Sequence, residues 1–277
     1  MKKIDFGRHV FGLAGILFGL ITLVWHDFSL WQRLPLADGN GRIFLAYVAG
    51  VIEIFGGIAL QSRKTARLGA IVLGGTYLVF TLLCISRIAA QPLVYDHWGN
   101  FFEDFSQVAG ALIIFAIFSD ISPENSARLV GAGYIFFAVC VVSFTLEQLF
   151  YLKATAEFVP KWIPPGQMFW AIATTIAFAL AAVSLLTGYL ALLASQLTTA
   201  MIVGFGLLVW LPAPLGNPHS LTNWAGNAQN LSIAGAAWIV ADFLNNRSRR
   251  ARPELLPTPA PASLEEAGLR PATGTAE

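Results

Sequence analysis

The chain has 277 residues, of which 56% are hydrophobic and 12% are charged, and this charged share is about half that of an ordinary soluble domain. The mean hydropathy is +0.65 and the net charge is +1, which excludes a water-soluble globular fold and a nucleic-acid partner. Apolar residues come in blocks of roughly 18 to 22, long enough to cross a membrane as helices, and they lack the alternation of barrel strands. The sequence therefore predicts an all-α integral membrane protein whose first partner is the lipid bilayer.

Eight transmembrane helices are predicted in chain order. They cover residues 8–26, 42–60, 68–88, 103–119, 128–147, 167–186, 190–210 and 224–244. The stretch 168–211 carries no charge and would be about 66 Å long as one helix, twice the membrane thickness. A tight turn at Thr187-Gly188-Tyr189 is therefore expected to divide it. The first apolar block follows a basic head like that of a signal peptide, but it is long enough to span and no small-x-small cleavage site follows it.

Basic residues predict that both termini lie in the cytoplasm. With the N-terminus inside, the cytoplasmic segments carry twelve Lys and Arg residues and the opposite segments carry five, which agrees with the positive-inside rule. Seven spans would put the cluster 247–252 on the opposite face. Residues 246–277 are rich in Pro and Arg and are expected to form a disordered cytoplasmic tail. The predicted location is the cell (inner) membrane.

An internal repeat predicts two tandem four-helix bundle repeats, residues 1–120 and 121–245. A shift of 125 residues lays 108–118 on 233–243 with six identities. The first helices align at a shift of 120, which places Arg8 on Arg128. Because each unit has an even number of helices, the two copies share one orientation and are related by a pseudo-two-fold axis along the membrane normal.

Glu53 is the candidate proton-relay residue. Eleven residues beyond Arg42, it would lie about 16 Å deep in the second span. An ionised carboxyl there costs several kcal/mol unless it is paired, so a functional role is one interpretation. The other is a neutral carboxyl that hydrogen-bonds a neighbouring helix, with close packing allowed by Gly50, Gly56 and Gly57.

The second cluster of polar residues is YDHWGNFFEDFSQ, residues 95–107, which leads into the fourth span. It offers carboxylates, an imidazole and an indole at one membrane surface, and Asp104 is its candidate catalytic acid. The substrate-binding candidates are Arg42, Arg87, His97 and Glu103. A quinone head group or a metal would accept such groups, whereas the structural alternative is an interfacial aromatic belt with solvated acids. No two histidines have a recognised ligand spacing, so no metal ligands are assigned.

The two halves differ in their ionisable residues. At the 125-residue shift Glu53 falls on Phe178 and Asp104 on Gln229. The site is therefore expected in the first four-helix unit, with the second unit as its packing partner.

Residues 8–118 resemble the DoxX-like family of membrane proteins. Arg8 opens the first span, Glu53-x-x-Gly56-Gly57 lies in the second, a basic turn covers 63–67, and Asn100-Phe101-Phe102 precedes the fourth span. The resemblance implies a four-helix membrane unit, here duplicated, and a link to quinone-dependent oxidation of sulfur compounds or to membrane redox complexes. The chain departs from the family in its duplication and in having no cysteine pair near a membrane surface.

Two functions are carried forward from the sequence. The first is a membrane subunit that handles a quinone or similar redox molecule in a cavity open to the periplasm or exterior, served by a membrane or periplasmic redox partner. The second is a non-catalytic protein, either a scaffold or a transporter-like bundle with an acid at the membrane midplane. No nucleophile triad, phosphate loop or CxxC motif identifies a reaction, and the sequence leaves open whether the protein is an enzyme.

Overall fold

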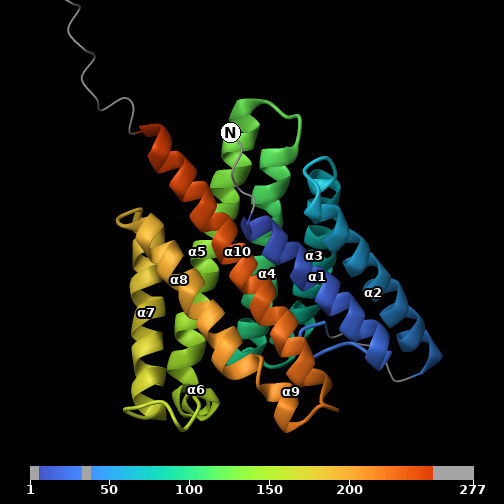
Figure 1. The fold of residues 1–277 in the computed structure, drawn as a ribbon, viewed down its shortest axis with the longest axis vertical. Helices are drawn as coiled ribbons and strands as arrows, with labels where there is room; N and C mark the ends of the chain where they lie inside the picture. The colour runs from blue at the N-terminus through green and yellow to red at the C-terminus, as the bar shows by residue number, and fades with distance from the viewer. Residues whose placement is uncertain (1–5, 33–38, 252–277) are drawn as a thin grey trace, which may run out of the picture.

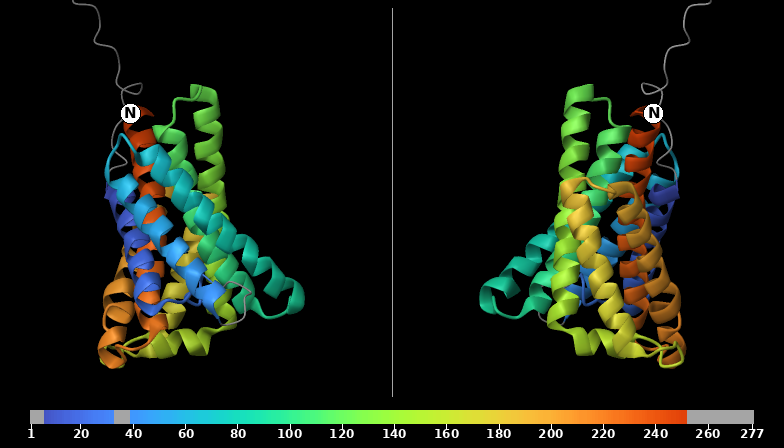
Figure 2. Two further views of the ribbon diagram at one scale, coloured as in Figure 1. Left: turned by 90° about the vertical axis from the view of Figure 1, so that its right-hand side faces the viewer. Right: turned by 90° about the vertical axis from the view of Figure 1, so that its left-hand side faces the viewer.

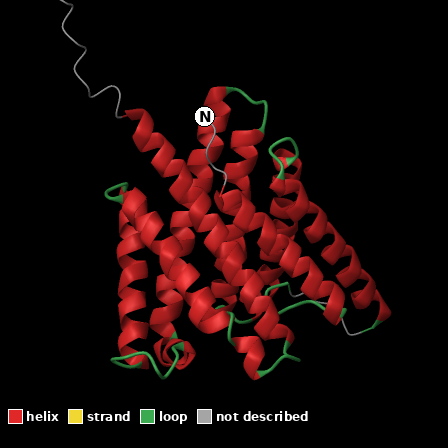
Figure 3. Ribbon diagram, in the orientation of Figure 1, coloured by secondary structure: helices red, strands yellow, loops and turns green. Residues whose placement is uncertain are grey.

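The computed structural model describes residues 6–32 and 39–251, and every regular element within them is a helix (Figures 1 and 3). The elements are α1 (Phe6–Trp25), α2 (Asn40–Gln61), α3 (Ala66–Ala90), α4 (Tyr95–Phe118), α5 (Pro123–Phe150), α6 (Leu152–Phe158), α7 (Gln167–Thr187), α8 (Ala191–Phe205), the π-helical turn η1 (Gly206–Trp210), α9 (Ala213–Gly216) and α10 (Leu221–Ala251).

Seven described helices are long and apolar enough to cross a membrane. They are α1 to α5, α7, and the segment Ala191–Gly216 that joins α8, η1 and α9. The predicted bounds of α1, α2, α3 and α7 are correct to within two residues. The expected turn between α7 and α8 is confirmed, because Gly188 caps α7 in the left-handed region at φ 77°.

The eighth predicted span is a helix, α10, but it is not among the seven. It packs against α1, α4 and α8, so most of its surroundings are protein rather than lipid, and a helix enclosed in this way needs less apolar surface. It also continues through Ala251, six residues into the segment 246–277 that was expected to be disordered. Residues 252–277 lie outside the described part of the chain.

The connections between spans differ from the prediction. α4 begins at Tyr95, eight residues before the expected start at 103, so the polar residues 95–102 form its first two turns rather than a loop. α6 and α9 were not predicted, because short helices beside a span leave no apolar block in the sequence.

The described helices form a ring, and α10 also contacts α4 and, more weakly, α5 across its middle. Neighbours around the ring are α1, α2, α3, α4, α5, α7, α8 and α10, and α10 packs against α1 to close it. α10 ends at the upper end of Figure 1 and α1 begins beside it in the upper half, whereas α6 and α9 lie at the opposite end, called here the α6 end. The side views show the connection between α3 and α4 projecting away from the other helices near that end (Figure 2).

Glycines let α1 and α2 approach backbone to backbone. A Cβ atom at Gly57 would overlap the carbonyl oxygen of Gly12, and one at Gly19 would overlap that of Gly50. Helices in a membrane gain little by burying apolar surface, so their association depends on the close contact that small residues allow. The expected close packing at Gly50 and Gly57 is confirmed. The opposite faces of α2 and α3 expose large apolar side chains, including Phe44, Val51, Phe55, Val79 and Leu82.

Candidate functional site

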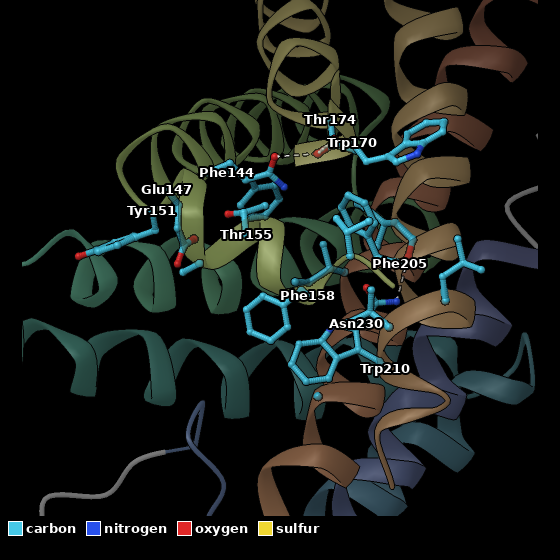
Figure 4. Close-up of a pocket in the computed structure, with 18 of the residues that line it drawn as sticks. Phe144, Glu147, Tyr151, Thr155, Phe158, Trp170, Thr174, Phe205, Trp210 and Asn230 are labelled. Carbon is cyan, nitrogen blue, oxygen red and sulfur yellow. Dashed lines mark hydrogen bonds between the residues drawn. The ribbon is translucent and has the colours of Figure 1, made fainter. Parts of the chain in front are cut away.

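A cavity of about 750 Å³ opens near the α6 end, between α4, α5, α6, α7, η1 and α10 (Figure 4). Its volume is in the range of ordinary small-molecule sites. Most of its wall is aromatic or aliphatic. The acidic and amide side chains in the wall are Asp96, Glu103, Glu147, Gln148, Gln229 and Asn230.

The position of this cavity differs from the expectation that the site lies within the first four-helix unit. Most lining residues come from the second half of the chain, and the first half contributes only Trp31, Asp96 and Glu103. The pocket therefore lies between the two halves. Of the six candidate residues, Glu103 alone lines it among the described residues.

Glu103 is held in the pocket wall by Trp31. The indole Nε1 of Trp31 donates a hydrogen bond of 2.5 Å to Glu103 Oε2. Trp31 belongs to the segment that follows α1, and its side chain is 7% exposed. Glu103 also interacts electrostatically with Asp96 and Glu147, so three carboxyl groups share this side of the pocket.

Glu147 approaches α4 at a glycine. A Cβ atom at Gly99 would overlap the carboxyl group of Glu147. The absence of a side chain at Gly99 therefore makes room for an acid from α5 beside the first turns of α4. Sequence reasoning did not single out Glu147, although an acid near the end of an apolar block was the available signal.

Asp104 lies behind the pocket wall and is 2% exposed. Gln229 Nε2 on α10 donates to Asp104 Oδ1 at 3.4 Å, and Cys84 Sγ lies 3.9 Å from its other oxygen. Asp104 interacts electrostatically with Glu103 on one side and with Glu53 on the other. Its contacts with Gln229 and Cys84 hold it between α3, α4 and α10.

Glu53 is fully buried, as the sequence predicted for a midplane acid. Gln32 Nε2 donates to Glu53 Oε1 at 2.6 Å, whereas Glu53 Oε2 has no hydrogen-bond partner among the described residues. The partner comes from the segment after α1 and not from a neighbouring helix. Thr22 and Ser29 both donate to Gln32 Oε1, at 3.2 and 3.1 Å, and so orient the amide with its nitrogen toward Glu53.

The side chain of Tyr77 on α3 is 2% exposed. It interacts electrostatically with both buried acids, Glu53 and Asp104. Of the carboxyl groups in this region, Asp96 is exposed, Glu103 and Glu147 are partly buried, and Asp104 and Glu53 are buried. We call these five residues the carboxyl chain.

A second polar cluster joins α4 and α10 in the middle of the bundle. Gln107 Nε2 donates to Gln229 Oε1 at 2.8 Å, and Ser232 Oγ donates to Gln107 Oε1 at 2.8 Å. The sequence placed Gln107 in the polar cluster 95–107 but gave no sign of its partners Gln229 and Ser232, because a lone amide in a membrane helix does not reveal what it contacts.

Arg42, Arg87 and His97 were expected to shape the mouth of the site, but none of them lines the pocket. Arg42 pairs with Asp27 at 2.5 Å and its guanidinium lies over the Phe28 ring. His97 Nε2 lies 3.0 Å from Gln91 Oε1. The Arg87 side chain, half-buried in the last turn of α3, makes no hydrogen bond within the described residues. These groups were expected to meet at one site because they lie near one another in the sequence. The rotation of each helix instead directs their side chains away from the pocket.

No group of three or more His, Cys, Asp or Glu side chains in the described ranges is arranged to hold a metal ion. A bundle of apolar spans with a wall of acids and aromatic residues defines the class of protein as a multi-pass α-helical membrane protein. No family model, curated protein or solved structure matches the chain.

Proposed function

We propose that the chain crosses the membrane eight times, as two four-helix units of the same orientation, with both termini in the cytoplasm and the α6 end on the periplasmic or external side of the cell membrane. The pairings α1–α2, α2–α3 and α3–α4 of the first unit recur as α5–α7, α7–α8 and α8–α10 in the second. α10 would be the eighth span, which agrees with α1 beginning and α10 ending in the upper half of the bundle (Figure 1).

Two hydrogen bonds support a parallel repeat rather than an inverted one. Asp104 bonds Gln229, and Gln107 bonds Ser232, and each pair is separated by 125 residues. This is the shift at which the two halves of the sequence align. Residues at equivalent positions meet at one height only if the axis that relates the two units runs along the helices. Membership of the DoxX-like family remains a proposal that rests on the sequence motifs alone.

The function that this arrangement supports best is proton-coupled handling of a small hydrophobic molecule by a transporter-like bundle. One observation carries the proposal: Glu103 in the pocket wall is followed in α4 by the buried Asp104, which interacts electrostatically with both Glu103 and the buried Glu53. Buried acids in a membrane helix are costly and typically mark proton or substrate paths. A ligand in the pocket would change the electrostatic field at Glu103. A proton would then be exchanged by way of Asp104 and Glu53.

The experiment uses the full chain in proteoliposomes with an imposed pH gradient. Three dyes serve as probes, Nile red (neutral), rhodamine 6G (cationic) and anilinonaphthalene sulfonate (anionic). We expect gradient-dependent movement of at least one dye, and a rate about tenfold lower for Glu53→Gln, which keeps the Gln32 hydrogen bond but releases no proton. Glu124→Gln, at an exposed pair with Arg128, is the matched control. Rates equal to those of protein-free liposomes for all three dyes would refute the proposal.

A quinone-linked redox subunit is the second candidate function, with a membrane or periplasmic redox partner. The observation in its favour is Gln148: its Oε1 accepts from Thr174 and Thr175, which leaves its amide NH₂ to donate to a quinone carbonyl inside an apolar, aromatic pocket. In this function the carboxyl chain would supply the protons of quinone reduction. Organic extracts of the purified protein test it, because a stoichiometric quinone favours the redox subunit. An extract without quinone, together with dye transport, excludes it.

A further inference from the structure

We infer that the ligand of the pocket is an organic cation with an aromatic or bulky apolar body. The inference deepens the proposed function and rests on the pocket being a ligand site. Two independent features of the described structure lead to it, the chemistry of the wall and the way the first half of the chain fills the equivalent space.

The wall combines negative charge with aromatic faces. Asp96, Glu103 and Glu147 line the pocket, and the described lining residues include no Lys, Arg or His. Four lining residues are tryptophans, the aromatic side chain that attracts cations most strongly. These are Trp31, Trp162, Trp170 and Trp210. Asp96 Oδ2 lies 3.7 Å from His97 Nδ1, whereas Glu103 and Glu147 have no basic partner among the described residues, so a cation would supply the countercharge that these two acids lack.

The acids and the aromatic rings meet at Glu103. Trp31, which donates to Glu103, packs edge to face on Trp210 with ring centroids 5.9 Å apart. Phe158 of α6 lies beside Trp210 at 6.0 Å (Figure 4). A cation placed here would contact a carboxylate and three ring systems at once, the arrangement that recognises organic ammonium groups.

The amide groups favour this ligand class over a neutral acceptor. Gln229 Nε2 already donates to Asp104, and Asn230 Nδ2 already donates to the carbonyl of Ile202. Gln148 is then the lining amide whose nitrogen has no acceptor among the described residues. Among the lining acids and amides, three carboxyl groups therefore stand against one amide nitrogen without an acceptor, which suits a ligand that brings positive charge or N–H groups.

The first half of the chain fills the equivalent space with its own side chains. Glu53 and Phe80 are the positions that the 125-residue shift places on Phe178 and Phe205, and these two phenylalanines line the pocket. In the first half, Gln32 donates an N–H to Glu53 at 2.6 Å.

In the same space, the ring of Phe28 packs on Phe80 with centroids 6.3 Å apart. The segment after α1 thus places an aromatic ring and an N–H donor in this space. The equivalent space in the second half is the cavity. A ligand ring would pack on Phe205 as Phe28 packs on Phe80, and Glu103 and Glu147 would face its positive group, because Phe178 stands where the first half has Glu53.

The test compares two ions of the same shape and opposite charge, tetraphenylphosphonium and tetraphenylborate, on the purified full chain in nanodiscs. Binding is followed by quenching of the fluorescence of the pocket tryptophans and by calorimetry. We expect tetraphenylphosphonium to bind and tetraphenylborate to bind at least about tenfold more weakly. Glu103→Gln, which retains an acceptor for Trp31, should lower the phosphonium affinity about tenfold. Glu147→Gln is an independent second variant, and Glu124→Gln is the control that should change nothing.

Equal affinity for the two ions, or unchanged phosphonium affinity in both pocket variants, would overturn the inference. A third probe, decylubiquinone, distinguishes failure of this inference from failure of the proposed function. If decylubiquinone binds in the pocket and phosphonium does not, the pocket is a ligand site of another class. If none of the three probes binds, the pocket is not a ligand site and both proposals fail.

Discussion

The amide nitrogen of Gln32 lies 2.6 Å from a carboxyl oxygen of Glu53, a residue 21 positions later in the chain. Gln32 is itself 2% exposed and belongs to the segment that leaves α1. The connection between α1 and α2 therefore turns back into the bundle and supplies the hydrogen bond that a buried acid requires.

This contact gives a prediction for two substitutions. Glu53→Gln should change the free energy of unfolding by less than about 1 kcal/mol, because Gln32 can donate to an amide oxygen as it does to a carboxyl oxygen. Gln32→Ala should cost about 1–3 kcal/mol, because it leaves the buried carboxyl without a donor. Equilibrium unfolding in mixed detergent micelles measures both. Equal losses for the two variants would mean that the hydrogen bond does not stabilise the bundle.

The close approach of α1 and α2 gives a second prediction. Gly57→Ala places a Cβ atom against the carbonyl oxygen of Gly12 and against Ile16, so the helices must separate and stability should fall by about 1–3 kcal/mol. Gly75→Ala on α3 is the matched control, since no atom lies within 4 Å of the added Cβ. It should be neutral or stabilise by up to about 1 kcal/mol. Thermal unfolding compares the two; a destabilised Gly75→Ala protein would contradict this account of helix packing.

The hydrogen bond from Trp31 to Glu103 can be measured by a double-mutant cycle. Trp31→Phe removes the indole donor and Glu103→Met removes the acceptor while keeping the chain length. The free energies of unfolding of the two single variants and the double variant should show a coupling of about 0.5–3 kcal/mol, as for residues in direct contact. Additivity to within about 0.3 kcal/mol would show that this hydrogen bond contributes nothing to the stability of the bundle.

Topology provides a fourth prediction. Reporter fusions after Lys64, Ser122 and Arg252 should report the cytoplasm, because eight spans bring the chain back to the side on which it starts. Fusions after Asp38, Gln91 and Asn217 should report the exterior. A fusion after Arg252 that reports the exterior would rule out α10 as a span.

Local composition was sufficient to predict the long helices. A segment in lipid must satisfy its backbone hydrogen bonds within one helix, so a block of apolar residues determines its own secondary structure. For this reason the bounds of α2 and α7 agree closely with the sequence. The same rule predicted that Glu53 is buried. It failed at α4, whose first turns are polar, and it gave no sign of α6, which lies beside the membrane spans and has no apolar block of its own.

The sequence by itself determined which residues form membrane helices and which buried acid would need a partner. Only the tertiary structure decided the contacts between them. Gln32 reaches Glu53, and Glu103 faces a pocket built mostly by the second half of the chain, whereas His97 and Arg42 are directed elsewhere. Which side chains meet depends on the rotation and tilt of each helix and on the path of the segment after α1. These are fixed by packing between residues far apart in the chain, and no local pattern encodes them.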